Sequence, residues 1–140
     1  MRISRRDFNK AGLGALSLAA LGGPAVAGPE GLIRKPIPSS GEMVPVIGLG
    51  TNRYGRRDRD VLLASLKRFH ELGGTVIDTA PMYGRSEAVL GDLIEELGIR
   101  DDLLVATKAD EEPGGDRTDA QMRRSQAALR IKTFDLMQVH

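Results

Sequence analysis

The chain has 140 residues, 41% of them hydrophobic and 28% charged, a balance typical of an ordinary soluble globular protein that can bury one core. Its formal net charge is +1, but residues 1–27 hold four basic residues against one acidic residue, so the rest is slightly acidic and indicates no nucleic-acid-binding surface. Cysteine is absent, which excludes disulfides, cysteine metal sites and thiol nucleophiles within these residues.

Residues 1–27 have the pattern of a signal peptide. A basic start precedes the apolar run 11–21, and the last three residues, Ala-Val-Ala, suit cleavage after Ala27. The apolar run is shorter than the roughly 20 residues of a membrane-spanning helix, so no stable membrane span is expected. Residues 4–10, Ser-Arg-Arg-Asp-Phe-Asn-Lys, resemble the twin-arginine export motif, with a departure at Asn9. The resemblance implies export by the twin-arginine machinery to a bacterial periplasm; an amphipathic or disordered N-terminus is the alternative.

Residues 28–140 are expected to form the folded domain, which begins with a glycine-containing linker over 28–35. Weak alternation around the turn-prone Ser-Ser-Gly at 39–41 predicts a small hairpin within 36–49. The apolar run 44–49 predicts the first strand of the domain proper.

That strand runs into Gly50, Thr51 and Asn52, which combine a close backbone approach with polar side chains at a strand end. The glycines at 48, 50 and 55 also invite comparison with the dinucleotide-binding fingerprint G-x-G-x-x-G. Here the third glycine comes five residues after the second, and the next acid at a strand end is Asp78, so the spacing argues against a Rossmann fold. A plain strand-to-helix turn is the other alternative.

Apolar spacing predicts a helix over 60–72, capped by Asp58 or Asp60 and ended by a glycine pair. His70 lies off its apolar stripe and is expected to be exposed to solvent without a role. The stripe consists of Leu62, Leu66, Phe69 and either Leu72 or Gly73.

A second strand is predicted over 75–79, because the run is apolar and β-branched. It delivers Asp78 at its end, and Tyr83 follows in the loop after a break at Ala-Pro. The next helix is predicted over 86–97, with Ser86 as N-cap and Glu87 favourably placed against the helix dipole.

The third strand is predicted over 103–107, with Lys108 at its C-terminal end and a polar loop over 109–117. A third helix is expected from Thr118 or Asp119 to Leu129, and a fourth strand over 134–139 leads to His140. A basic stripe on this helix is interpreted as a solvated face; it consists of Arg123, Arg124 and Arg130.

The order β, α, β, α, β, α, β with short connections predicts a parallel sheet of right-handed βαβ units. The chemistry-bearing residues fall at successive strand ends or in the loop that follows. Because the carboxyl ends of parallel strands meet at one edge, we expect them to converge there. They are Asp78, Tyr83, Lys108 and His140.

Two stretches connect this order to a known family. Residues 78–91, Asp-Thr-Ala-Pro-Met-Tyr-Gly-Arg-Ser-Glu-Ala-Val-Leu-Gly, resemble the signature of the aldo/keto reductases, and the ending Asp-Leu-Met-Gln-Val-His resembles their active-site histidine motif. Members of that family are NADPH-dependent (β/α)8 TIM barrels. The resemblance implies an α/β fold with about the first four βα units, a hairpin that plugs the barrel bottom, and no metal. It places Gly50, Thr51, Asn52 and Asp78 at the nicotinamide.

The implied activity is reduction of aldehyde or ketone carbonyls of small molecules to alcohols, and these residue types suit it. A phenol of ordinary pKa, about 10, holds its proton at neutral pH, so Tyr83 is a candidate general acid. An ammonium at Lys108 stabilises the phenolate, and Asp78 keeps that ammonium charged. A neutral imidazole at His140 would donate a hydrogen bond to the substrate oxygen.

Two other functions remain open. Lys108 could form a Schiff base in a lyase or aldolase, which requires a desolvated amine that is not paired to Asp78. A non-catalytic, reductase-like protein is the second. A full barrel typically needs about 250 residues, so we expect this chain to be the N-terminal part of a longer protein and, taken alone, to aggregate or dimerise and be inactive.

Overall fold

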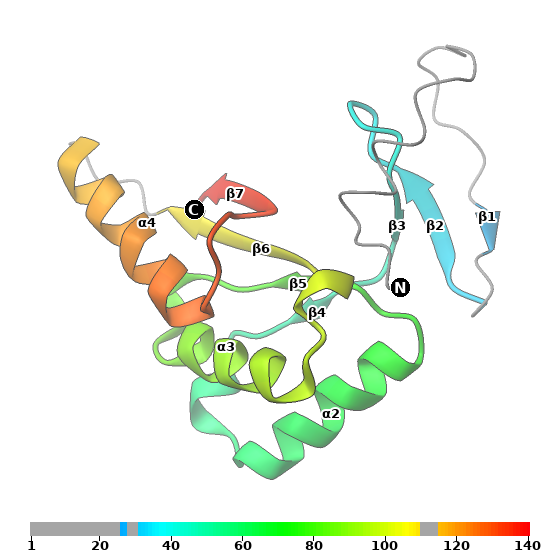
Figure 1. The fold of residues 1–140 in the computed structure, drawn as a ribbon, viewed down its shortest axis with the longest axis horizontal. Helices are drawn as coiled ribbons and strands as arrows, with labels where there is room; N and C mark the ends of the chain where they lie inside the picture. Colours follow the sequence, from blue (N-terminus) through cyan, green and yellow to red (C-terminus); the bar gives the residue numbers. More distant parts are fainter. Residues whose placement is uncertain (1–25, 28–30, 110–114) are drawn as a thin grey trace.

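The computed structural model describes residues 26–27, 31–109 and 115–140, which form two sheets and three α-helices (Figure 1). The first sheet is antiparallel, in the order β1-β2-β3, and the second is parallel, in the order β4-β5-β6-β7. The strands are β1 (Val26–Ala27), β2 (Ile33–Pro36), β3 (Met43–Pro45), β4 (Leu49–Gly50), β5 (Val76–Asp78), β6 (Leu104–Ala109) and β7 (Leu136–Val139).

The parallel sheet follows chain order, with a helix between each pair of consecutive strands, as the sequence predicts. The helices are α2 (Arg59–Glu71), α3 (Ser86–Leu97) and α4 (Gly115–Leu129), and Figure 1 shows them gathered on one side of the sheet. Short 3-10 turns complete the loops: η1 (Tyr54–Arg56), η2 (Pro81–Tyr83) and η3 (Arg100–Asp102). In the parallel sheet each strand lies beside the one that precedes it in the chain. A Rossmann fold has a doubly wound strand order instead, so the Rossmann alternative is excluded.

The core lies between the sheet and the helices. The predicted stripe of α2 is confirmed at Leu62 and Leu66, which are buried, and at Phe69, which packs against the core. Of the two residues expected at the last position of the stripe, Leu72 is 49% exposed, because it follows the last helical residue, and Gly73 is half-buried. Asp58 is the cap, since its carboxylate accepts hydrogen bonds from the N–H groups of the first turn.

Helices α3 and α4 approach each other closely at Gly91. A Cβ on this glycine would stand 2.3 Å from the carbonyl oxygen of Ala128, so only a residue without a side chain fits. α3 then ends at Gly98, whose φ of 64° lies in the left-handed region that favours glycine. Helix α4 begins at Gly115, earlier than predicted, and the expected loop over 109–117 is correspondingly shorter at both ends.

The N-terminal sheet corrects two predictions. The expected linker 28–35 contains most of β2, and the expected strand 44–49 is divided between β3, in the hairpin, and β4, in the parallel sheet. Pro45 is the last residue of β3, so it lies where the expected strand divides. The hairpin lies beyond the N-terminal ends of the parallel strands (Figure 1), and Arg34 fastens it there by donating to the carbonyl oxygen of Gly73 at 3.0 Å.

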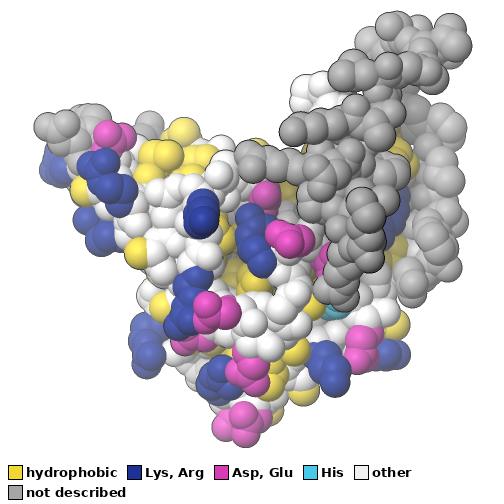
Figure 2. Space-filling model, in the orientation of Figure 1, with side chains coloured by type: hydrophobic (Ala, Val, Ile, Leu, Met, Phe, Trp, Pro, Cys, Tyr) yellow, Lys and Arg dark blue, Asp and Glu magenta, His cyan; other side chains and the backbone are white. Residues whose placement is uncertain are grey.

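Most of the predicted signal peptide, residues 1–25, lies outside the described residues, while Val26–Ala27 forms β1 and pairs with β2. Among the described residues, no helix combines the length and the apolar character needed to span a bilayer. On the face drawn in Figure 2, basic and acidic side chains are interspersed rather than gathered into one patch of either sign.

Candidate active site

The four predicted catalytic residues lie at the carboxyl edge of the parallel sheet. Asp78 is the last residue of β5, Tyr83 is the last residue of η2, Lys108 is the penultimate residue of β6, and His140 directly follows β7. The parallel register aligns Asp78 with Ala106, two residues before Lys108. Side chains alternate between the faces of a strand, so Asp78 and Lys108 project from the same face.

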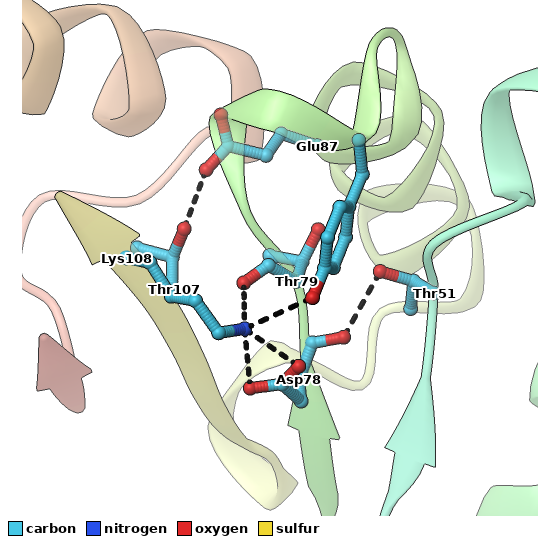
Figure 3. Close-up of polar contacts among 7 residues, drawn as sticks. Thr51, Asp78, Thr79, Glu87, Thr107 and Lys108 are labelled. Carbon is cyan, nitrogen blue, oxygen red and sulfur yellow. Dashed lines mark hydrogen bonds and ion pairs between the residues drawn. The ribbon is translucent and has the colours of Figure 1, made fainter. Parts of the chain in front are cut away.

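Lys108 is the centre of this group (Figure 3). Its Nζ donates to both carboxylate oxygens of Asp78, at 2.8 and 2.7 Å, and to the carbonyl oxygen of Thr79 at 3.0 Å. It also donates to the hydroxyl of Tyr83 at 3.4 Å. An ammonium has three N–H donors, and these acceptors surround all of them. We call Asp78, Tyr83 and Lys108 the rim cluster.

The environment of Lys108 keeps it protonated. Burial lowers the pKa of its amine, but the hydrogen bonds and charge of Asp78, together with the hydroxyl of Tyr83, outweigh burial and raise the pKa above its ordinary value of 10.5. The exposed fractions of the two side chains differ: 12% for Lys108 and 42% for Asp78. The rim cluster is therefore a shielded cation beside a carboxylate that water and ligands can reach.

The phenol of Tyr83 lies close to both the amine and the imidazole. Its ring centroid is 5.1 Å from Lys108 Nζ and 6.0 Å from the His140 ring, which it meets edge to face at 85°. The backbone N–H of His140 donates to the carbonyl oxygen of Ala109 at 2.9 Å, so the chain remains joined to β6 beyond the end of β7. All four predicted residues are thus brought together.

The predicted cofactor residues divide into exposed and buried ones. Gly50 is exposed, pairs with Asp78 in the sheet, and has no heavy atom within 4 Å of where a Cβ would stand. Asn52 is exposed as well. Thr51 is fully buried, and both its hydroxyl and its N–H donate to the carbonyl oxygen of Asp78, at 3.0 and 3.1 Å. Thr51 therefore holds the backbone of the site instead of presenting its side chain to a ligand.

A second carboxylate, which sequence reasoning missed, lies on the other face of β6. Glu87 is only 6% exposed and accepts hydrogen bonds from the hydroxyls of Thr107, at 2.7 Å, and Ser125, at 3.0 Å. We call these three residues the helix-side cluster. The sequence did contain a signal that Glu87 is buried. Glu87 precedes Leu90 and Ile94 by three and seven residues, so it lies on the apolar stripe of α3.

Several smaller predictions need correction. Ser86 is the first helical residue rather than the N-cap, a position that Arg85 occupies. His70, which was expected to have no role, contacts a side chain from another part of the chain, because its Nε2 lies 3.0 Å from a carboxylate oxygen of Asp102. The basic stripe is exposed as predicted at Arg123, Arg124 and Arg130, although Arg130 lies just beyond the end of α4 and also forms ion pairs with two acidic residues of α3.

Tyr54 is a buried tyrosine outside the rim cluster. Its ring belongs to the core, and its hydroxyl is buried without a hydrogen-bond partner among the described residues. Burial raises the pKa of Tyr54. Within the described part of the chain, no group of three or more His, Asp or Glu side chains is placed to hold a metal ion.

An ammonium between a carboxylate and a phenol, with an imidazole facing the same phenol, suits proton transfer at the phenol oxygen. Comparisons with known proteins show the family of the chain. The model of the aldo/keto reductase family matches residues 46–140. Aflatoxin B1 aldehyde reductase member 2 of Mus musculus is 35% identical over 140 residues, which cover 92% of this chain and 38% of that protein. Methylglyoxal reductase DkgB of Salmonella typhi is 37% identical over 99 residues, 69% of this chain and 36% of that protein.

Solved structures give the same result. A putative aldo-keto reductase from Pseudomonas aeruginosa matches with a TM-score of 0.69 and 33% identity, over 76% of this chain and 45% of that chain. An aldo-keto reductase from Klebsiella pneumoniae in complex with NADPH matches with a TM-score of 0.65 and 31% identity, over 71% of this chain and 36% of that chain. The chain thus spans less than half the length of these relatives. It belongs to the aldo/keto reductase family, and its parallel sheet with its helices is part of a (β/α)8 barrel.

Proposed function

We propose that the protein is an NADPH-dependent oxidoreductase that reduces aldehyde or ketone carbonyls of small molecules to alcohols, with Tyr83 as the general acid. The observation that carries the proposal is the position of Lys108, whose amine lies within hydrogen-bonding distance of both the Asp78 carboxylate and the Tyr83 hydroxyl. Each partner has a distinct effect. Asp78 keeps the amine protonated, and the Tyr83 hydroxyl accepts a hydrogen bond from that amine.

The chain's own residues suffice for the proton half of the reaction. Tyr83 donates its proton to the carbonyl oxygen as negative charge develops there, and the ammonium of Lys108 stabilises the phenolate that remains. His140, whose ring faces that of Tyr83, donates a hydrogen bond to the same oxygen and orients it. When bound, NADPH supplies the hydride for the carbonyl carbon.

The residues at the edge of the sheet fit a nicotinamide. Gly50 leaves open space where a side chain would stand, and exposed Asn52 and half-exposed Asp78 offer polar groups beside it. Thr51 contributes indirectly, by holding the carbonyl oxygen of Asp78. The Klebsiella pneumoniae relative in complex with NADPH supports the choice of cofactor.

The Schiff-base alternative lacks its main requirement. An amine that attacks a carbonyl must lose its proton, whereas Lys108 is paired to Asp78 and its pKa is raised. Borohydride treatment in the presence of substrate tests this alternative, because it would trap a covalent adduct on Lys108 only in a lyase or aldolase.

The test of the proposed function uses protein expressed from the complete reading frame, with methylglyoxal as the probe and loss of NADPH absorbance as the readout. Tyr83→Phe should lower kcat by about 10²- to 10⁴-fold, since it removes only the acidic hydroxyl. Tyr54→Phe is the matched control, because Tyr54 is the chain's other tyrosine and its hydroxyl is buried outside the rim cluster. Equal rates for wild type and Tyr83→Phe would refute Tyr83 as the acid. A wild-type protein that oxidises no NADPH with this or other small aldehydes would favour a non-catalytic role.

We also propose that the protein is exported to the periplasm by the twin-arginine machinery and cleaved after Ala27. The support is the sequence motif alone. Cleavage there would remove β1 but leave the β2–β3 hairpin, since the bonds between those two strands do not involve β1. Replacing Arg5 and Arg6 by lysine should keep the protein in the cytoplasmic fraction. Recovery of the intact protein only from the cytoplasm with both arginines present would refute the proposal.

A further inference from the structure

The first turn of α3 begins with two buried polar residues, Ser86 and Glu87. The hydroxyl of Ser86 donates to the carbonyl oxygen of Tyr83 at 2.9 Å and accepts from the N–H of Gly55 at 3.2 Å. One side chain therefore joins the η2 turn, which carries the phenol, to the η1 turn and to the helix. The backbone at Tyr83 is held by this contact independently of Lys108.

Glu87 makes the equivalent connection to β6. Its Oε1 accepts from the hydroxyl of Thr107, which is fully buried and directly precedes Lys108 in the strand. Adjacent residues of a strand project to opposite faces. The hydrogen bond from Thr107 to Glu87 therefore fixes the orientation of the β6 backbone at the point from which the Lys108 side chain projects. Figure 3 shows Thr107 directed to Glu87 and the neighbouring Lys108 directed to Asp78.

A carboxylate is a costly residue at this place. Burying a charge is unfavourable unless its oxygens are well hydrogen-bonded, and the neighbouring stripe positions of α3, Leu90 and Ile94, are apolar and buried. An apolar side chain at position 87 would continue that stripe without the cost of desolvation. It would not, however, hold Thr107.

We propose that Ser86 and Glu87 are positioning residues, and that the first turn of α3 sets the separation of the Tyr83 hydroxyl and the Lys108 amine by holding the turn of one and the strand of the other. This inference rests on the proposed function, because it assigns that separation, 3.4 Å, a part in proton transfer. Neither residue touches substrate or cofactor in this role. They act through Tyr83 and Lys108.

The sharpest test compares Thr107→Val with Ser125→Ala in protein expressed from the complete reading frame. Each substitution removes one hydroxyl from the same buried carboxylate, so each should destabilise the fold by a similar amount. Only Thr107, however, is joined to Lys108; Ser125 belongs to α4. The two variants therefore separate positioning from stability.

We expect Thr107→Val to lower kcat by about 10- to 100-fold, with KM for the carbonyl substrate changed less than about threefold, at a temperature where both variants are fully folded. Ser125→Ala should keep the wild-type kcat. Crystal structures provide a second readout, in which the distance from Lys108 Nζ to the Tyr83 hydroxyl lengthens in Thr107→Val alone. Equal kcat values for the two variants, or an unchanged distance in Thr107→Val, would overturn the proposal.

Glu87 itself supplies a rescue experiment. Glu87→Gln retains an oxygen to accept from Thr107 and an amide to donate to Ser125, so kcat should stay close to that of wild type, whereas Glu87→Leu should behave like Thr107→Val. A glutamine variant as slow as the leucine variant would contradict a geometric role. Failure of this inference is distinct from failure of the proposed function: if Tyr83→Phe abolishes reduction while Thr107→Val is fully active, only the positioning role is wrong.

Discussion

Strand β6 carries a carboxylate cluster on each of its faces, and the two clusters differ in their access to solvent. In the rim cluster, the carboxylate of Asp78 is 42% exposed and faces an ammonium. In the helix-side cluster, the whole Glu87 residue is 6% exposed, and its carboxylate faces two hydroxyls. Thr107 and Lys108 are adjacent in sequence, yet they belong to different clusters. One strand thus presents reactive groups on one face and structural bonds on the other.

The comparison teaches that exposure decides the role of a carboxylate more than residue type does. A half-exposed carboxylate can meet a ligand, and its contribution to stability is small because water competes for it. A buried carboxylate cannot meet a ligand, and loss of a partner leaves an unsatisfied charge. Substitutions in the rim cluster should therefore change activity more than stability. Those in the helix-side cluster should lower the free energy of unfolding, and only those that break the bond between Glu87 and Thr107 should also lower kcat.

The largest expected effect is that of Lys108→Met. The variant keeps a long side chain but removes the ammonium that stabilises the phenolate, so kcat for carbonyl reduction should fall by about 10²- to 10⁴-fold. The free energy of unfolding should fall by only about 1 kcal/mol, because Asp78 remains hydrated. Steady-state kinetics and urea unfolding measure the two effects separately.

Lys67→Met on the exposed face of α2 is the matched control and should change neither quantity. A Lys108→Met protein with the wild-type kcat would contradict the distinction between the two clusters, because the rim cluster would then have no role in catalysis.

Gly91→Ala should have the next largest effect, and it acts where α3, which carries Glu87, meets α4, which carries Ser125. The new Cβ would meet backbone atoms of α4, the closest at 2.3 Å, and backbone cannot move aside as a flexible side chain can. We expect a loss of about 3 kcal/mol or more in the free energy of unfolding, since overpacking against a rigid neighbour is costly. Thermal or urea unfolding measures it.

Ser65→Ala, on the exposed surface of α2, controls for the helix propensity of alanine and should be nearly neutral. Wild-type stability in Gly91→Ala would mean that the close approach of α3 and α4 is not required.

Alkaline pH should reveal a smaller contribution from the rim cluster. The pKa of Lys108 is raised in the folded protein, so its stabilising effect is fully present below the unfolded value of 10.5 and is lost as the pH rises through the higher folded value. Asp78→Asn removes the main cause of the raised pKa. We therefore expect the difference in unfolding free energy between wild type and Asp78→Asn, measured in urea from about pH 8 to about pH 12, to shrink as the pH rises. The decrease in that difference should be about 1 kcal/mol or less. Parallel curves over this range would contradict the assignment.

Tyr54→Phe should have the smallest effect, and it is expected to be favourable. The Tyr54 hydroxyl is buried without a partner among the described residues, whereas both carboxylate oxygens of Glu87 are hydrogen-bonded. Removing an unsatisfied polar group should raise the free energy of unfolding by up to about 1 kcal/mol and leave kcat unchanged. Urea unfolding would detect the change, and a destabilised variant would indicate that the hydroxyl has a partner, such as a buried water.

The parallel sheet was largely predictable because its signals are local. Apolar periodicity, the cap at Asp58 and the stop at Gly98 indicate helices and their ends without reference to the rest of the chain. The N-terminal hairpin was predicted less well. Its strands have exposed hydrophobic residues, such as Ile33 and Met43, and a short run of this kind does not reveal where one sheet ends and the next begins.

One part of the candidate site could likewise be predicted from the sequence and another part could not. The rim cluster could be predicted because parallel topology brings successive strand ends to one edge, and this follows from the order of elements alone. The helix-side cluster could not, because it joins three elements through hydroxyl groups whose burial depends on how closely α4 approaches α3. Thr107 and Ser125 are common polar residues, and nothing in their local sequence shows that they share one carboxylate.

The sequence alone determined the order of strands and helices, the edge of the sheet at which acid, phenol, amine and imidazole meet, and the family to which they belong. These properties follow from periodicity, from turn residues and from a motif within one short stretch. Only the tertiary structure decided which carboxylate is open and which is closed, that Thr51 is an anchor and that Tyr54 is buried. Burial is a property of the packed chain, because each residue's exposure depends on neighbours that are distant in the sequence.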